Sequence, residues 1–422
     1  MGSFVIEGGH RLSGQVRISG AKNAILPILA AALLCPEECL IHEVPELRDV
    51  TVMLDILRYL GVEVETRTSE GGRRRSISTK AGQFRTHIGP SDLMGQMRSS
   101  IFVMGPLLGR LGRVTVTYPG GCAIGPRPID LHLRGLSALG ARFRERYGRI
   151  EAEAPNLTGN EVHLDFPSVG ATENIMMAAV LAEGTTIIRN TAREPEIVDL
   201  QNFLNSMGAQ VRGAGSDSIR IDGVRRLHGA EHSVIPDRIE AGTMLAAVAA
   251  TGGCVELANI VEDHIESAVA KLREAGLLIR EGRDTLEARA SGRLRSVDFK
   301  TLPYPGFPTD LQPQAMALMS VTEGTSLITE TVFDKRFNHV EELTRMGARI
   351  RVEGRAAVVE GVDSLSGTEV TVPDLRGGAA LVIAGLAAEG VSKVKGTDHI
   401  DRGYDGFEVK LTGLGAIIRR EP

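Results

Sequence analysis

Apolar residues recur at intervals of three and four in several segments of the chain, and each of these segments ends at a glycine. Ahead of Gly61 the apolar positions are Val50, Met53, Leu54, Leu57 and Leu60. This spacing predicts an amphipathic helix with one buried face. A glycine just past the last turn accepts the left-handed conformation that closes a helix. Residues 62–65 then alternate between apolar and acidic, which predicts a strand.

The same ending occurs six times, at intervals of 68 to 79 residues. The six glycines are Gly61, Gly140, Gly208, Gly276, Gly347 and Gly415. Repetition at a nearly fixed period indicates copies of one supersecondary unit. The sequence therefore predicts six repeats, each with an amphipathic helix that runs into a strand.

A second helix in the repeat is rich in alanine and leucine and is apolar nearly all round. Its copies are expected at residues 21–34, 171–181, 241–250, 314–321 and 379–388. A helix with no polar face is buried in the protein. Each repeat is thus predicted to contain, in order, a strand, a buried helix, a strand, an amphipathic helix, and a strand or hairpin. Three repeats per domain, with helices inside and sheets outside, is the simplest packing, and the fold class is α/β.

Composition narrows the class of protein. The chain has 422 residues, 42% hydrophobic and 24% charged, as in globular proteins with two domains. It has no run of eighteen apolar residues and no signal-like N-terminus, so we expect no membrane partner and a cytoplasmic location. The net charge of −5 and the absence of tryptophan argue against a nucleic-acid partner.

The four cysteines are too few for a disulfide framework, which indicates a reducing compartment. Cys35 and Cys39 have no second pair at metal-ligand spacing and are interpreted as structural. We expect no metal. Cys122 differs from them, because residues 119–128 hold three glycines and three prolines. That stretch predicts an exposed or movable loop, where a thiol is harder to explain by packing; a thiol that merely occupies a turn is the alternative.

Polar residues stand where the buried helices begin. Asp237, Asp310 and Asp374 are either N-caps or ligand contacts, and the sequence leaves both interpretations open.

Lys22, Arg98 and Arg376 are at helix starts too, where a cation opposes the helix dipole at a cost of roughly 0.3–1 kcal/mol. Each could be a solvated surface cation. Together they make sense if they surround an anion. Further cations that could join them are Arg127, Arg336 and Arg402. A ligand with a phosphate and a carboxylate would suit such a site.

Five motifs resemble those of the enolpyruvyl transferases. They are residues 19–24 (SGAKNA), 120–125 (GGCAIG), 193–199 (REPEIVD), 307–310 (FPTD) and 399–404 (HIDRGY). The resemblance extends from Gly14 to Gly415. It implies two inside-out α/β barrel domains, each of three βαβαββ-type repeats, joined by two crossings of the chain. The implied domains are residues 1–21 with 236–422, and residues 22–235, which carry the Cys122 loop.

The resemblance is strongest to the members that act on UDP-N-acetylglucosamine. It implies that the 3-hydroxyl of this sugar adds to C2 of phosphoenolpyruvate, and that phosphate is then eliminated. That reaction is the first committed step toward peptidoglycan, and it is inhibited by fosfomycin. The resemblance implies two small-molecule substrates and no cofactor, and it leaves the oligomeric state open.

The resemblance also implies roles for individual residues. Cys122 is expected to donate a proton and to form an adduct with phosphoenolpyruvate, and Asp310 to act as base, with Lys22 and Arg402 completing the catalytic set. The residues expected to bind phosphoenolpyruvate are Lys22, Asn23, Arg98, Arg127, Arg376 and Arg402. Those expected to bind the nucleotide sugar are Asn23, Arg98, Arg127, Pro128, Ile129, Asp130, Leu131, Ser168, Val169, Gly170, Asp310 and Val332. Asp237, Arg336 and Asp374 are expected to support them.

Two features depart from the family pattern. Phe166 stands where relatives often have lysine, which predicts one diphosphate contact fewer and weaker binding of the nucleotide sugar. Gly377 and Gly378 are unusual at a helix start and suggest a weakened helix there.

Two other functions stay open at this stage. One is the sister reaction on shikimate 3-phosphate, although the sister enzymes lack the cysteine loop. The other is a non-catalytic, clamp-like binding protein, because repeated α/β units also build clamps. A clamp would need a basic inner surface and would not need Cys122 or Asp310.

Overall fold

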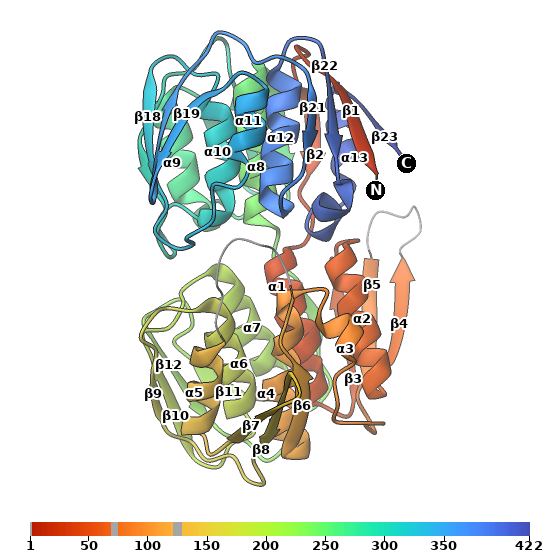
Figure 1. The fold of residues 1–422 in the computed structure, drawn as a ribbon. Helices are drawn as coiled ribbons and strands as arrows, with labels where there is room; N and C mark the ends of the chain where they lie inside the picture. The colour runs from red at the N-terminus through yellow and green to blue at the C-terminus, as the bar shows by residue number, and fades with distance from the viewer. Residues whose placement is uncertain (1, 69–74, 121–128) are drawn as a thin grey trace. The chain divides into compact units, whose positions relative to one another are not determined.

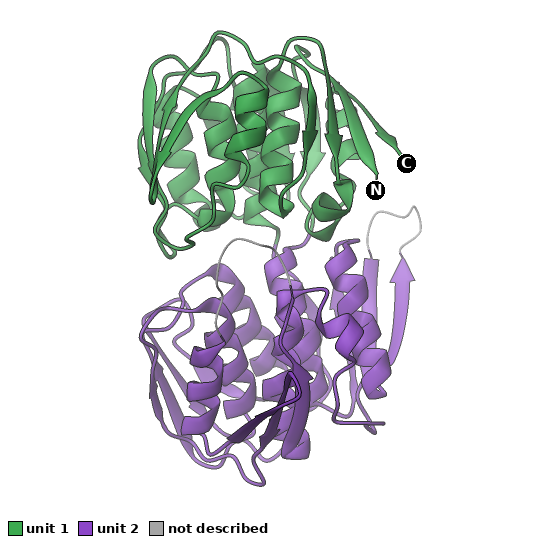
Figure 2. Ribbon diagram, in the orientation of Figure 1, with its two compact units in different colours: residues 1–19, 123–126, 236–422 green, residues 20–122, 127–235 purple. Residues whose placement is uncertain are grey.

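The computed structural model describes residues 2–68, 75–120 and 129–422. By their internal contacts these residues fall into two compact units (Figure 2). Unit 1 takes the chain up to Ser19 and again from Pro236 to Pro422. Unit 2 takes the described residues between Gly20 and Ile235.

The described residues form six sheets of one topology, three in each unit. An edge strand pairs in parallel with a second strand, which is followed by two antiparallel strands; in strands β9, β10, β12 and β11, for example, only the first pair is parallel. Five sheets have four strands. In the sixth a single parallel bridge from Ile88 to Thr115 replaces the edge strand.

Unit 1 contains repeats four to six. The fourth is β2 (Ser13–Arg17), α8 (Arg238–Thr251), β14 (Cys254–Ala258), η3 (Glu262–His264), α9 (Glu266–Ala275), β15 (Leu278–Glu281) and β16 (Thr285–Arg289). The fifth is β17 (Phe299–Lys300), η4 (Thr309–Leu311), α10 (Gln312–Met319), β18 (Thr325–Thr329), α11 (Val340–Arg345), β19 (Arg349–Glu353) and β20 (Ala356–Glu360). The sixth is β21 (Glu369–Thr371), α12 (Leu375–Ala387), β22 (Val391–Lys395), η5 (Thr397–Arg402), α13 (Phe407–Gly413), β23 (Ile417–Glu421) and β1 (Ser3–Glu7).

Unit 2 contains repeats one to three. The first is β13 (Glu231–Ser233), α1 (Lys22–Ala31), η1 (Ala32–Leu34), β3 (Glu38–His42), α2 (Arg48–Leu60), β4 (Glu63–Thr68) and β5 (Arg75–Lys80). The second is α3 (Ser91–Met94), η2 (Arg98–Val103), α4 (Met104–Leu111), β6 (Arg113–Thr117), α5 (Asp130–Ala138), β7 (Arg142–Arg146) and β8 (Arg149–Glu153). The third is β9 (Glu161–His163), α6 (Val169–Ala179), β10 (Thr185–Arg189), α7 (Pro195–Ser206), β11 (Gln210–Arg212) and β12 (Ser218–Asp222).

The apolar helices lie inside each unit, as their sequences predict. In unit 1, α8, α10 and α12 contact one another (Figure 1). In unit 2, α6 packs on both α4 and α1. The strands around them alternate between buried and less buried residues, so each sheet turns one face to its helices. No helix in the described part of the chain is long and apolar enough to span a bilayer.

The six glycines that end the amphipathic helices share one backbone conformation. Their φ angles lie between 95° and 104°, the left-handed region that residues other than glycine rarely adopt. This common conformation confirms the sixfold repeat that the spacing predicts.

The glycine pair at the start of α12 has a packing role. A Cβ on Gly378 would lie 2.7 Å from Ile400 Cγ1 and 2.8 Å from Val372 Cγ1. Helix α12 runs without interruption through both glycines. These glycines let neighbouring segments approach closely, and the expectation of a weakened helix stays a prediction.

The chain passes between the units at one repeat of each unit, between the edge strand of that repeat and its inner helix. Strand β2 pairs in parallel with β14, but the chain enters α1 after β2. Strand β13 likewise pairs with β3, but the chain enters α8 after β13. Unit 2 is thus an insertion in a repeat of unit 1, and each interrupted repeat is completed by a strand distant in sequence.

Two glycines of α4 test how tightly the inner helices pack. A Cβ on Gly105 would lie 2.4 Å from the backbone oxygen of Asn174 in α6, whereas a Cβ on Gly109 would meet its nearest neighbour, Leu181 Cδ1, at 3.4 Å. We predict that Gly105→Ala lowers the free energy of unfolding by about 1–3 kcal/mol. Gly109→Ala, the matched control, should be neutral or stabilising by up to about 1 kcal/mol. Urea denaturation measures both, and equal effects would contradict the close contact.

Candidate active site

Two of the three aspartates at the starts of inner helices in unit 1 are N-caps. The Asp237 carboxylate accepts hydrogen bonds from the backbone N–H groups of Ile239 (2.8 Å) and Glu240 (2.9 Å). The Asp374 carboxylate accepts from the N–H groups of Arg376 (3.0 Å) and Gly377 (3.1 Å). For these two the capping interpretation is confirmed.

Asp310 has different partners. It lies in η4, where the N-cap position is Pro308 and has no side-chain cap. Asp310 Oδ1 accepts from Arg336 Nη2 at 2.8 Å, and Oδ2 accepts from Arg376 Nη2 at 3.0 Å and Nε at 3.3 Å. Both arginines are nearly fully buried. Two guanidinium groups thus hold this carboxylate by both oxygens and favour its ionised form.

Tyr404 holds Arg376 from the other side. The guanidinium carbon lies 5.3 Å from the centre of the Tyr404 ring, within cation–π range. The Tyr404 hydroxyl is 2.9 Å from Thr243 Oγ1 and accepts from Gln314 Nε2 at 3.0 Å. Burial raises the pKa of Tyr404, so the hydroxyl keeps its proton.

Gln314 connects this cluster to Asp310. Its Nε2 also donates to the Asp310 backbone oxygen at 2.9 Å, and its side chain is fully buried in α10. The sequence analysis missed Gln314 and Thr243. The available signal was a polar residue inside a largely apolar helix, because most buried polar side chains have a hydrogen-bond partner.

Two further residues of unit 1 were predicted to belong to the site, Arg402 and Val332. Arg402 ends η5, a segment that contacts α12, and its side chain is partly exposed. Val332 follows β18, and its N–H donates to Glu330 Oε1 at 2.8 Å. Unit 1 therefore brings together Asp310, Arg336 and Arg376, with the capped starts of α8 and α12 beside them.

Lys22 in unit 2 has a buried partner. It is the first residue of α1, and its Nζ lies 2.9 Å from Asp49 Oδ2. The two side chains are 10% and 4% exposed. The carboxylate offsets the unfavourable position of a cation at a helix start. Sequence reasoning missed Asp49, although an acidic residue next to Val50, at the start of the buried stripe, was a signal.

Other predicted residues of unit 2 open neighbouring elements. Arg98 begins η2, a 3-10 helix, and not the α-helix that the repeat predicts. Ser168 caps α6, with its Oγ accepting from the Ala171 N–H at 3.3 Å. Since α1 and α6 both contact η2, Lys22, Arg98 and Ser168 begin three elements that pack together.

The remaining nucleotide-sugar candidates of unit 2 follow these starts. Asn23 is the second residue of α1, Ile129 precedes α5, and Asp130 and Leu131 are in its first turn. Val169 and Gly170 open α6. A Cβ on Gly170 would lie 3.1 Å from the His132 ring, so this glycine allows α5 and α6 to approach.

Three predicted residues, Cys122, Arg127 and Pro128, lie outside the described residues. Phe166 is 44% exposed.

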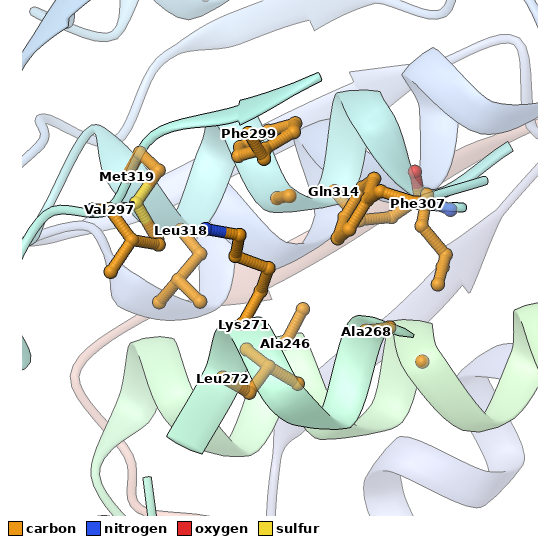
Figure 3. A pocket seen from close by; sticks show the side chains of 13 residues that line it. Ala246, Ala268, Lys271, Leu272, Val297, Phe299, Phe307, Gln314, Leu318 and Met319 are labelled. Atoms are coloured by element: carbon orange, nitrogen blue, oxygen red, sulfur yellow. Dashed lines mark hydrogen bonds between the residues drawn. The ribbon is translucent and has the colours of Figure 1, made fainter. Parts of the chain in front are cut away.

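A small pocket in unit 1 does not coincide with these residues. It has a volume of about 20 Å³, room for roughly one water molecule, and lies among α8, α9, α10 and β17 (Figure 3). Its lining is apolar apart from Lys271 and Gln314. A volume that holds about one water molecule is too small for a substrate.

Burial of His339 should lower the stability of unit 1 at acidic pH. Its ring is fully buried beside Asp374 and Arg336, and desolvation lowers its pKa to about 4. The unfolded chain therefore binds more protons between pH 4 and 6.5. The free energy of unfolding should fall by up to roughly 3 kcal/mol as the pH drops through this range.

We predict that His339→Leu flattens this pH dependence relative to the unmodified protein. His10→Asn, at an exposed position paired with Glu7, is the control and should keep the original slope. Denaturant unfolding at pH 4, 5, 6 and 7 measures the difference. An unchanged slope in the His339 variant would mean that other groups cause the loss of stability.

Comparisons with known proteins agree with this fold. The family described as EPSP synthase (3-phosphoshikimate 1-carboxyvinyltransferase) matches residues 6–411. A protein of Symbiobacterium thermophilum named UDP-N-acetylglucosamine 1-carboxyvinyltransferase 1 is 60% identical over 99% of this chain and 95% of its own length. A protein of Carboxydothermus hydrogenoformans named UDP-N-acetylglucosamine 1-carboxyvinyltransferase 2 is 57% identical over 100% of this chain and 99% of its own.

Among solved structures, the enolpyruvyl transferase NikO from Streptomyces tendae is 26% identical and superimposes with a TM-score of 0.88, covering 100% of this chain and 99% of its own. This similarity confirms the α/β fold class of repeated units in two domains. The names of the similar proteins favour an enzyme over a clamp, and the nucleotide-sugar reaction over the shikimate reaction. The chain belongs to the enolpyruvyl transferase family.

Proposed function

We propose that this chain transfers the enolpyruvyl group of phosphoenolpyruvate to the 3-hydroxyl of UDP-N-acetylglucosamine and releases phosphate. The observation that carries the proposal is the identity of 60% and 57%, over essentially the whole chain, to two proteins named for this reaction. The chemistry of the residues at the helix starts supports it.

The reaction needs two proton transfers in its addition step. Asp310 takes the proton of the sugar hydroxyl while the hydroxyl oxygen attacks C2 of phosphoenolpyruvate. Cys122 delivers a proton to C3 of phosphoenolpyruvate. Cys122 can also form a covalent adduct with phosphoenolpyruvate. Loss of a proton from C3 and departure of phosphate then complete the transfer. A well-placed general acid or base contributes roughly 10²–10⁴-fold to such a step.

Cationic side chains bind the charged ends of phosphoenolpyruvate. We assign this role to Lys22, Arg98, Arg127, Arg376 and Arg402, with Asn23 beside them. Charge-assisted hydrogen bonds to phosphate and carboxylate are stronger than neutral ones and stabilise charge that develops in the transition state. Support for the assignment is the burial of Lys22 and Arg376, each held in one orientation by a carboxylate.

The nucleotide sugar is bound by a second set of residues. We assign this role to Asn23, Arg98, Arg127, Pro128, Ile129, Asp130, Leu131, Ser168, Val169, Gly170, Asp310 and Val332. Asp237 and Asp374 support the site by capping α8 and α12, and Arg336 by holding Asp310. The exposed Phe166 offers no charge to the diphosphate, so binding of the sugar should be weaker than with lysine there.

The proposed reaction places the protein at the start of peptidoglycan synthesis in the cytoplasm. Through the cell wall it would affect cell shape and division. Alkylation of Cys122 by fosfomycin would block it.

The substrate pair can be tested directly. Protein mixed with phosphoenolpyruvate and UDP-N-acetylglucosamine should release phosphate. The same protein with phosphoenolpyruvate and shikimate 3-phosphate should release none. Release only with the shikimate compound would move the assignment to the sister reaction, and release with neither would refute transferase activity.

The proposed role of Asp310 has its own test. Asp310→Asn keeps the shape of the side chain but removes the charge, and we predict a fall in kcat of about 10²–10⁴-fold. Asp363→Asn, at a highly exposed position paired only with Arg293 among the described contacts, is the control and should keep full activity. Steady-state phosphate release measures both. Equal activity of the two variants would exclude Asp310 as the base.

A further inference from the structure

Glu330 is a buried acidic residue that has no place among the roles proposed above. It directly follows β18 and is 1% exposed. Its carboxyl group accepts four hydrogen bonds from three separate stretches of unit 1. All four donors are neutral groups, two of them threonine hydroxyls and two of them backbone N–H groups. A buried carboxyl group with both oxygens engaged in this way is held in one orientation.

The first oxygen of Glu330, Oε1, anchors the segment that follows β18. It accepts from the backbone N–H groups of Val332 at 2.8 Å and Phe333 at 3.1 Å. It also accepts from Oγ1 of Thr301, the residue after β17, at 2.9 Å. The same Oγ1 accepts from the Thr331 N–H at 2.9 Å. This oxygen thus fixes the position of Val332, which the proposed function assigns to the nucleotide sugar.

The second oxygen, Oε2, binds a different part of the unit. It accepts from Thr309 Oγ1 at 2.9 Å, and the two residues are 21 positions apart in the chain. Thr309 is the first residue of η4 and stands next to Asp310. This helix is a single turn of three residues, and its N-cap residue, Pro308, makes no side-chain cap. The backbone at Asp310 therefore depends on contacts with other segments, and the bond from Thr309 to Glu330 is one of them.

The contacts of Glu330 close a ring that includes the ion pair of Asp310 and Arg336. Arg336 Nη2 donates to Asp310 Oδ1 at 2.8 Å. The Arg336 guanidinium carbon lies 5.7 Å from the centre of the Phe333 ring, within cation–π range. The Phe333 N–H is bound to Glu330 Oε1, and Oε2 is bound to Thr309. The two oxygens of Glu330 thus join the segment that carries the arginine to the turn that carries the carboxylate.

Closing the turn after β18 accounts for only part of this arrangement. The two N–H bonds to Oε1 are enough to close that turn. The bond from Thr309 to Oε2 adds nothing to the turn and connects it to the segment of the proposed base. Reacting groups must be held within a fraction of an ångström of their productive geometry, and neighbours with a fixed orientation provide this.

We propose that Glu330 is a positioning residue for the transfer reaction. It holds η4 and the segment after β18 at a fixed separation, so that the Asp310 carboxylate meets the hydroxyl of a nucleotide sugar bound beside Val332. Glu330 acts through its neighbours and is not itself a reacting group. This inference rests on the proposed function and deepens it.

Thr309 offers a test that leaves Glu330 in place. Thr309→Val keeps the shape of the side chain but removes the hydroxyl, and Thr309→Ser keeps the hydroxyl but removes a methyl group. We expect Thr309→Val to lower kcat by about 10–100-fold and Thr309→Ser to stay near the unmodified protein. The KM for phosphoenolpyruvate should change little in both, because its proposed cations lie on other elements. A kcat that follows the methyl group and not the hydroxyl would overturn the proposal.

Two replacements of Glu330 itself separate the bridge from the charge. Glu330→Met keeps the length of the side chain without its acceptors, and kcat should fall at least as far as in Thr309→Val. Glu330→Gln should keep most of the activity, because its amide oxygen accepts from the Oε1 donors and its NH2 group donates to the Thr309 hydroxyl. Glu342→Met is the matched control and should keep full kcat, since Glu342 also accepts from a backbone N–H, that of Thr371 at 3.0 Å. Equal loss in the Met and Gln variants of Glu330 would contradict the bridging role.

Hydrogen exchange of the free protein gives a second readout that needs no activity. In Glu330→Met the backbone amides of both η4 and residues 331–337 should exchange faster than in the unmodified protein, and in Glu342→Met neither should. Faster exchange in residues 331–337 alone would mean that Glu330 only closes its own turn, and would overturn the proposal. If the unmodified protein releases no phosphate, the proposed reaction fails, whereas exchange in η4 still decides whether Glu330 holds the turn of Asp310.

Discussion

Three helices that are apolar on all sides must surround one another, and the site residues depend on this constraint. Because the repeats of a unit follow one another around its core, its inner helices run in the same direction. Their N-terminal ends, with unsatisfied N–H groups, therefore lie at one end of the unit. In unit 1 the starts of α10 and α12 are close enough for Asp310 and Arg376 to pair at 3.0 Å. Residues separated by 66 positions thus become neighbours through helix packing alone.

The same constraint concentrates charge where burial is unfavourable. Arg336, Arg376, Asp237 and Asp374 are each at most 5% exposed. Burying unpaired charges costs several kcal/mol per ion, and here each is paired or caps a helix. Apolar side chains at this end of the unit would be simpler to stabilise than buried charges. Clusters of this kind are concentrated at functional sites.

Most of the fold was predictable from the sequence, because it is repeated six times. The terminal glycines and the apolar helices carry local signals, and every copy strengthens the inference. The crossing of the chain between units was implied only by the family resemblance. It depends on β2 pairing with β14, and β13 with β3. Pairings over such distances leave no periodic signal.

The sequence indicated which residues lie at the helix starts but not which partner each of them has. Asp237, Asp310 and Asp374 look alike in the sequence, since each follows closely on a proline at a helix start. Two cap helices, and the third pairs with arginines 26 and 66 positions away. Capping is a local interaction and can be read from neighbouring residues. An ion pair between repeats cannot. The pair of Lys22 and Asp49 lies within one repeat, and its only signal was the place of Asp49 beside the buried stripe of α2.

Arg376 cannot stabilise the Asp310 carboxylate and an anionic substrate with full strength at the same time. While it donates to Asp310 Oδ2 from both Nε and Nη2, it stabilises the carboxylate and makes it a weaker base. A phosphate or carboxylate beside Arg376 would compete for the same charge. As that anion binds, Asp310 would lose part of its stabilisation and gain proton affinity. Arg336 and Gln314 would still hold Asp310 in place, by its Oδ1 and its backbone oxygen. In the proposed reaction the base would therefore become strong only when phosphoenolpyruvate is present.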